Sequence, residues 1–68
     1  MHKLSKKLAV NFKRIREEKG LTQGDVFRSS RIDRAYICRV ESGRVNPTLE
    51  NLYKLANALG VEAWELLK

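Results

Sequence analysis

The segment from Thr22 to Gly43 constrains the fold of this 68-residue chain more than any other feature. It holds two short stretches that each begin at a residue suited to cap a helix, Thr22 and Asp33. The first stretch follows Gly20, which is placed to end a preceding helix. A turn at Ser29–Arg31 separates the two stretches. Two capped helices with so short a connection form a helix-turn-helix.

The second of these helices, expected at about residues 34–42, has one apolar face and one polar, basic face. At about 100° per residue, an α-helix places one set of side chains on each side. An ordinary amphipathic surface helix has the same periodicity, so the neighbouring caps favour the helix-turn-helix. The inward set is Tyr36, Ile37 and Val40, and the outward set is Arg34, Ala35, Cys38, Arg39 and Ser42.

Apolar spacing and capping residues predict five helices in the whole chain, at about residues 5–19, 23–29, 34–42, 49–59 and 62–67. Sparse aromatics and little alternation favour an all-α fold, and 68 residues suffice for a single domain over 1–68. The expected buried positions of the first helix are Leu4, Leu8, Phe12 and Ile15, and those of the fourth are Leu49, Leu52, Leu55, Ala56 and Leu59.

The charge of the chain favours a polyanionic partner. The net charge is +6, and it is unevenly distributed. Residues 1–46 carry 12 Lys/Arg against 5 Asp/Glu, whereas residues 47–68 carry 2 against 3. An excess of cations at this level is typical of nucleic-acid binders. We therefore expect double-stranded DNA to be bound by the first three helices.

Several other classes of protein are disfavoured. The chain has no apolar run long enough to span a membrane and no signal-peptide core, and its single cysteine suits a reducing cytoplasm. His2 is the only histidine, and neither paired carboxylates, nor a phosphate-binding glycine loop, nor metal-ligand spacing is present. We therefore expect no enzyme, no cofactor and no metal site. A basic helix at residues 3–19 could also lie on a membrane, but its apolar stripe is better explained as core.

The outward residues of the second helix are the candidates for reading DNA bases. Arg34 can contact guanine O6 and N7 with its planar fork, or a phosphate. Ala35 offers a methyl group suited to a thymine methyl. Arg39, one turn further on, can read a base or bind a phosphate equally well. Cys38 is either a small side chain that allows close approach to the bases or a redox-sensitive thiol.

A longer set of motifs is found in the segments Leu21–Gln23, Ile32–Arg34, Tyr36–Ile37, Val40–Gly43, Asn46–Leu49 and Leu52–Val61. This set resembles the helix-turn-helix domain of the Cro/C1 (XRE) family of phage and bacterial regulators. The resemblance covers about residues 8–67. It implies a compact five-helix, lambda-repressor-like fold in a cytoplasmic protein of bacterial or phage origin. Within the family, the string Asp33–Ile37 and Asn46 are most similar to restriction–modification controller proteins.

Two groups of polar residues are candidates for binding the DNA backbone. Gln23 occupies the first turn of its helix, where unpaired N–H groups attract an anion. Ser42, Arg44 and Asn46 resemble a second phosphate-binding group of the family. The resemblance further implies that Arg16 and Glu41 form a partly buried ion pair that ties the first helix to the third. Removing one partner would strand a charge.

Three residues depart from the family pattern in and beside the second helix. Arg31 stands where glycine commonly occupies the turn, so a positive φ there would be strained. Phe27 replaces a small residue between two helices, and Gly24 lowers the intrinsic stability of its helix. These substitutions put the spacing of the two helices in question, and leave the predicted fold unchanged.

The last predicted helix contains three large apolar residues within only six positions. Trp64, Leu66 and Leu67 either fill the core of a small domain or form a two-fold dimer interface. One recognition helix contacts few base pairs, whereas a dimer reads a palindrome with half-sites about one turn apart. The family resemblance implies the dimer.

These features favour a homodimeric, sequence-specific transcriptional regulator that occupies a DNA operator and blocks or recruits RNA polymerase. The alternative is an antitoxin-like or phage-repressor-like module whose main role is to bind a protein partner. A start at Met1 and a last helix that ends cleanly favour a complete small regulator.

Overall fold

The computed structural model describes residues 3–68, and within them it contains four α-helices and one 3-10 helix but no strand. The predicted all-α class is therefore confirmed, and the first four predicted helices agree with the structure within two residues at each end. His2 lies outside the described residues. The elements are α1 (Lys3–Glu18), α2 (Gln23–Ser30), α3 (Arg34–Glu41), α4 (Leu49–Leu59) and η1 (Ala63–Leu66).

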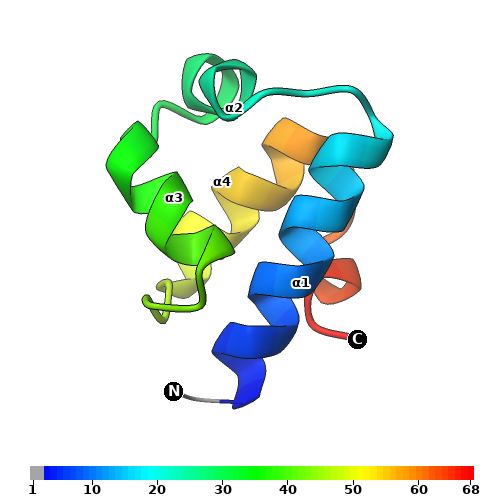
Figure 1. Cartoon of the computed structure of the whole chain (residues 1–68), viewed down its shortest axis with the longest axis vertical. Coiled ribbons are helices and arrows are strands. Elements are labelled where there is room, and N and C mark those ends of the chain that lie inside the picture. Colours follow the sequence, from blue (N-terminus) through cyan, green and yellow to red (C-terminus); the bar gives the residue numbers. More distant parts are fainter. Residues whose placement is uncertain (1–2) are drawn as a thin grey trace.

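The helices enclose a single core in a body of 27 × 21 × 19 Å (Figure 1). α1 packs against α3 and η1, and α2 packs against α3 and α4. η1 also contacts α4, so that the end of the chain closes the side of the core next to α1. Every helix thus has at least two packing partners, which leaves α3 with one face inward and one face outward. None of the helices in residues 3–68 is long and apolar enough to cross a membrane.

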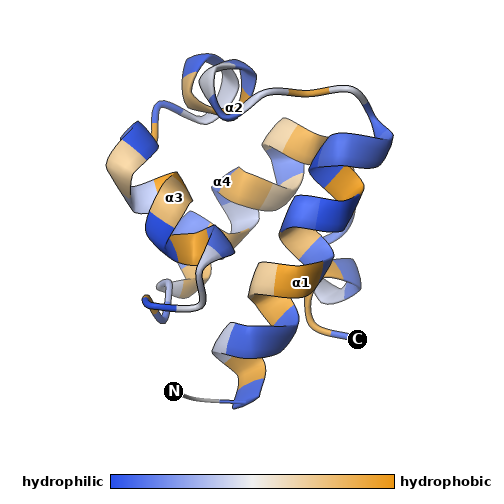
Figure 2. Ribbon diagram, in the orientation of Figure 1, coloured by the Kyte–Doolittle hydropathy of each residue, from blue (hydrophilic) through white to orange (hydrophobic). Residues whose placement is uncertain are grey.

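The core is built from one stripe of each helix, as the apolar spacing predicts. In Figure 2, hydrophilic and hydrophobic segments lie side by side on the same helices, which is typical of helices with one buried face. Phe12 and Leu55 are fully buried at the centre. The core cluster consists of Leu8, Phe12, Ile15, Val26, Ile32, Ile37, Val40, Leu52, Leu55, Ala56, Leu59 and Leu66.

Capping residues define most helix boundaries. Thr22 and Thr48 have extended backbones, and each hydroxyl accepts the N–H of the residue three positions on, Asp25 and Asn51, at 3.0 and 3.1 Å. Gly60 ends α4 in the left-handed conformation, at φ 74°. The Thr22 cap was predicted. The two threonine caps fix where α2 and α4 begin, and hence where α3 lies between them.

The C-terminal segment differs from the prediction in two respects. It forms one turn of 3-10 helix instead of an α-helix, closed by bonds from Glu65 N–H to the Glu62 carbonyl and from Leu67 N–H to the Trp64 carbonyl, both 3.0 Å. Segments this short commonly adopt 3-10 geometry. Leu66 is fully buried in the core, so its assignment to a dimer interface is wrong.

The other two apolar residues of this segment have different environments. Leu67 is half-buried and packs against the core, whereas Trp64 is 62% exposed. A single 3-10 turn cannot point Trp64, Leu66 and Leu67 toward the core at the same time, and Leu66 takes the inward position. Asn11 of α1 fastens the turn from the other side, because its Nδ2 donates to the carbonyls of Leu66 at 3.0 Å and Lys68 at 3.3 Å.

Two leucines that were expected in the core are exposed. Leu4 is 47% exposed and Leu49 is 84% exposed. Both lie in the first turn of their helices, at the margin of the core, and together they line a small groove of about 140 Å³ beside Pro47 and Leu67. The apolar period of each helix continues past the point where the packed core ends, which the sequence pattern does not reveal.

Candidate nucleic-acid interface

The outward face of α3 is polar and basic, as predicted. All four candidate base-reading residues, Arg34, Ala35, Cys38 and Arg39, are exposed. On the opposite face, Ile37 and Val40 are fully buried and Tyr36 is half-buried against the core. The inward side chains thus fix the rotation of α3 about its axis, and the outward side chains are presented together on one surface.

An ion pair fastens the end of α3 to α1. Arg16 Nε donates to Glu41 Oε2 at 2.6 Å and Arg16 Nη2 donates to Oε1 at 3.1 Å. The two side chains are only 12% and 7% exposed, and Arg16 Nη1 also donates to the Leu21 carbonyl at 2.7 Å. The hydrogen bond to Glu41 raises the pKa of Arg16 in spite of its burial. This bidentate contact orients α3 relative to α1 and to the start of α2.

Gln23 has a partner that the sequence did not reveal. The Gln23 Nε2 donates to Glu41 Oε1 at 3.1 Å, so one carboxylate joins α1, α2 and α3. Gln23 stands at the first position of α2, as expected for a phosphate ligand. A glutamine at a helix start carries no pattern that identifies a carboxylate 18 residues away. The contact therefore depends on the tertiary packing.

The turn between α2 and α3 is held by Ser30 and not by Asp33. Ser30 Oγ donates to the Val26 carbonyl at 2.7 Å and accepts the Ile32 N–H at 3.1 Å. Asp33 occupies the N-cap position of α3, but its side chain makes no capping hydrogen bond, so the predicted cap is wrong in this respect. Arg31 has φ 63°, in the left-handed region where glycine is favoured.

The three other predicted phosphate-binding residues follow α3. Ser42 is the C-cap of α3, and its Oγ donates to the Arg39 carbonyl at 3.1 Å. Gly43 follows at φ 74°, which turns the chain into the loop before α4. Ser42, Arg44 and Asn46 are exposed. They are accessible to a ligand at the C-terminal end of α3.

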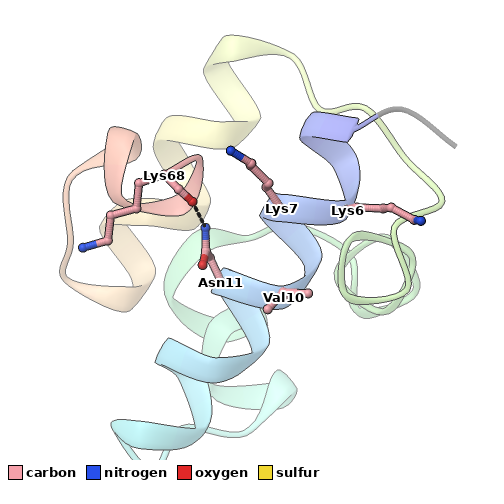
Figure 3. Close-up of a pocket in the computed structure, with 5 residues that line it drawn as sticks. All are labelled: Lys6, Lys7, Val10, Asn11 and Lys68. Carbon is pink, nitrogen blue, oxygen red and sulfur yellow. Dashed lines mark hydrogen bonds between the residues drawn. The ribbon is translucent and has the colours of Figure 1, made fainter.

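A shallow hollow on the other side of α1 has a different character. It has a volume of about 300 Å³ and is lined by Lys6, Lys7, Val10, Asn11 and Lys68. The three ammonium groups point away from one another, and the Asn11 amide is directed at the chain end, where it bonds the Lys68 carbonyl (Figure 3). The hollow therefore lacks the convergent polar groups of a ligand site. Within residues 3–68, no group of three or more His, Cys, Asp or Glu side chains is placed to hold a metal ion.

Comparisons with known proteins agree with this geometry. A family model described as a helix-turn-helix matches residues 12–65. An uncharacterised HTH-type transcriptional regulator, y4dJ of Sinorhizobium fredii, is 47% identical over 64 residues, which are 94% of this chain and 83% of that protein. Two other curated relatives are longer, and the chain spans 57% and 48% of their lengths.

Solved structures of restriction–modification controller proteins have the same fold. The controller C.AhdI of Aeromonas hydrophila superimposes with a TM-score of 0.86 at 39% identity, over 91% of this chain and 94% of that one. The controller C.Esp1396I, solved as a tetramer in complex with its natural 35-base-pair operator, gives 0.86 at 33% identity over the full length of both chains. The matched family model, the identity to y4dJ and these two structures show that the chain belongs to the helix-turn-helix family of the Cro/C1 (XRE) type.

Proposed function

We propose that this protein is a homodimeric transcriptional regulator that binds a palindromic DNA operator with α3 in the major groove. The observation that carries the proposal is the two-sided character of α3. Its inward face is buried and its end is fastened by Arg16 and Glu41, while its outward face presents cations and small side chains. A helix held in this way can enter a groove without rearrangement.

The outward residues of α3 have the chemistry needed to read base pairs. Arg34, at the first position of the helix, suits the two acceptors of guanine. Ala35 and Cys38 are small enough for the helix to approach the bases, and Arg39 adds a second fork one turn on. The residues that follow α3 suit phosphate contacts. Ser42, Arg44 and Asn46 would set the register of the helix along the groove.

Gln23 can serve both the protein and the DNA. Its amide nitrogen has two hydrogens, and one is used in the bond to Glu41. The second remains available for a phosphate at the start of α2, where the helix dipole also favours an anion. We therefore assign Gln23 a phosphate contact that is oriented by Glu41. This would couple the position of the phosphate to the orientation of α3.

Dimerisation follows from the small reach of one helix. α3 has eight residues and is therefore about 12 Å long, enough for only a few base pairs. A two-fold dimer doubles the number of base pairs read and demands a palindromic site. Trp64 is exposed and Leu67 is half-buried at the surface beside it, so we place the interface there.

The bound dimer would regulate transcription by blocking RNA polymerase or by recruiting it, according to where the operator lies. The similarity to C.AhdI and C.Esp1396I supports a role as the controller of a restriction–modification system. The comparisons do not favour the alternative, a module whose main role is to bind a protein partner. A reporter gene with the operator placed upstream of, or across, the promoter distinguishes activation from repression.

Selection from a randomised duplex-DNA library, followed by sequencing at two salt concentrations, tests the proposal. We expect a palindrome whose affinity falls steeply with salt. Arg34→Ala should relax one base position in each half-site, and Arg44→Ala should weaken binding to all sequences and lower the salt slope. Lys54→Ala, on α4, is the matched cation control and should change neither. Binding without any enriched sequence would contradict the proposal.

A further inference from the structure

The two arginines on the outward face of α3 are held very differently. Arg39 lies over the ring of Tyr36, with 5.7 Å between its Cζ and the ring centroid. This distance is within the range of a cation–π contact, and the spacing of three residues places both side chains on adjacent turns. The side chain of Arg34, among the residues the structure describes, makes no hydrogen bond, ion pair or ring contact.

The ring under Arg39 is itself fixed from two sides. Tyr36 packs against the hydrophobic core, and its hydroxyl accepts a hydrogen bond from Asn51 Nδ2 at 3.3 Å. Asn51 lies in the first turn of α4, where its N–H is bound by the Thr48 capping hydroxyl at 3.1 Å. A chain of contacts therefore leads from the cap of α4, through Asn51 and Tyr36, to the guanidinium of Arg39.

The positive charge of Arg39 is left available by this arrangement. The ion pairs in the described part of the chain involve other cations, among them Arg16 with Glu41 and Arg28 with Asp25. A guanidinium held by a carboxylate has part of its charge neutralised, whereas stacking on an aromatic ring leaves its edge N–H groups free for an acceptor. Arg39 is thus ordered and still able to bind a base edge or a phosphate.

We propose that Tyr36, anchored by Asn51, is a positioning residue that orders Arg39 for contact with DNA. The proposal rests on the DNA-binding function proposed above. An arginine loses much rotamer freedom when it is immobilised at an interface, which weakens binding. Stacking on Tyr36 restricts Arg39 before DNA arrives, so less freedom is lost on binding. Arg34 has no such support and would be ordered only by the DNA.

NMR of the protein without DNA tests the stacking by itself. The side-chain Nε–Hε signal of Arg39 should show a ring-current shift from Tyr36. We expect the shift to be lost in Tyr36→Leu and kept in Tyr36→Phe, while the Arg34 signal changes in neither variant. An Arg39 signal that is the same in the wild type and in Tyr36→Leu would overturn the proposal.

A double-mutant cycle on the selected duplex tests the consequence for DNA. Tyr36→Leu should weaken binding by about two- to fivefold per half-site, the usual size of an exposed cation–π contact. In an Arg39→Ala background the same substitution should have no further effect, because its target is absent. Equal losses in both backgrounds, or no loss from Arg39→Ala, would overturn the role assigned to Tyr36.

Two conservative variants keep the test decisive if Tyr36→Leu does not fold. Tyr36→Phe and Asn51→Ala remove the same hydrogen bond and leave the ring in place. They should weaken binding equally and less than Tyr36→Leu, and neither should weaken it when Arg39 is alanine. If Tyr36→Phe weakens binding, Asn51→Ala does not, and the loss from Tyr36→Phe persists in the Arg39→Ala background, then the hydroxyl itself contacts DNA. That result would overturn the proposal. If the wild-type protein binds no duplex, that result would instead contradict the proposed DNA-binding function, and the role of Tyr36 would fall with it.

Discussion

At the scale of single residues, Glu41 fastens α3 to the two helices that precede it. Its two oxygens accept from Arg16 of α1 and from Gln23 of α2, and the carboxylate is almost completely buried. Three elements thus meet at one acid. A buried charge of this kind stabilises the fold only while its partners are present, because an unpaired charge in the interior is strongly unfavourable.

Replacing Glu41 with glutamine should therefore destabilise the protein clearly. The variant strands the Arg16 guanidinium, and we expect the free energy of unfolding to fall by about 2–4 kcal/mol. Urea denaturation measures the change. The matched control is Glu18→Gln, which breaks the exposed pair with Arg14 and should stay within about 0.5 kcal/mol of the wild type. Equal losses in the two variants would show that burial does not strengthen the Arg16–Glu41 pair.

Arg31 offers the opposite case, a residue that the fold tolerates against its preference. Its φ of 63° is disfavoured for any side chain with a Cβ. Arg31→Gly should raise the free energy of unfolding by about 0.5–1 kcal/mol, since relief of strain exceeds the extra entropy of glycine in the unfolded chain. Arg31→Ala removes the same charge and keeps the strain. If alanine stabilises as much as glycine in thermal melts, charge and not backbone geometry is responsible.

At the scale of elements, α2 depends on its capping box because it is short and contains a glycine. Thr22 N–H donates to Asp25 Oδ2 at 2.8 Å, and Asp25 N–H donates to the Thr22 hydroxyl at 3.0 Å. Arg28 also donates to the other Asp25 oxygen. The hydrogen bond from the Thr22 backbone, together with these contacts, lowers the pKa of Asp25 below its ordinary value of 3.8.

The capping box should therefore make the stability of the native state depend on pH in the acidic range. A carboxylate whose pKa is lowered by folding stabilises the native state above its ordinary pKa of 3.8, and that stabilisation disappears as pH falls through the lower folded value. The wild type should thus exceed Asp25→Asn in urea resistance at neutral pH, and the difference should shrink at about pH 2. Asp33→Asn is the control at neutral pH, because the Asp33 side chain makes no capping hydrogen bond. A difference that does not change with pH would contradict this account.

At the scale of the whole molecule, the charge is divided unevenly along the chain. The first 46 residues carry a net charge of +7 and the last 22 carry −1. The same division separates the helix-turn-helix from the segment with the exposed Trp64. The excess of cations in the segment that contains the helix-turn-helix attracts DNA, whereas the nearly neutral C-terminal segment adds little repulsion between two copies. The arrangement suits a dimer that binds DNA through one face of each subunit.

Substitutions at Trp64 and at Leu66 should therefore have separate effects, the first on dimerisation and the second on folding stability. Trp64→Ala should shift the protein toward monomer in analytical ultracentrifugation and leave thermal stability of the diluted protein almost unchanged, because the side chain is 62% exposed. Leu66→Ala should lower the free energy of unfolding by about 2–5 kcal/mol, since the side chain is fully buried. A Trp64→Ala variant that remains dimeric would place the interface elsewhere on the surface.

Local signals in the sequence predicted the four α-helices and the two faces of α3. Apolar spacing, Thr22, Thr48 and the glycine stops are local signals, because each depends on residues within a few positions of one another. The same local periodicity separated buried Ile37 and Val40 from exposed Arg34 and Arg39. The ion pair of Arg16 with Glu41 was expected only through resemblance to a family.

The packing of the helices selected among these local signals. It exposed Leu49, because the core ends before the first turn of α4, and it buried Leu66, because one 3-10 turn has a single inward position. It joined Gln23 to Glu41 and Tyr36 to Asn51. Contacts between residues far apart in the chain depend on how helices pack, and no sequence period encodes that packing.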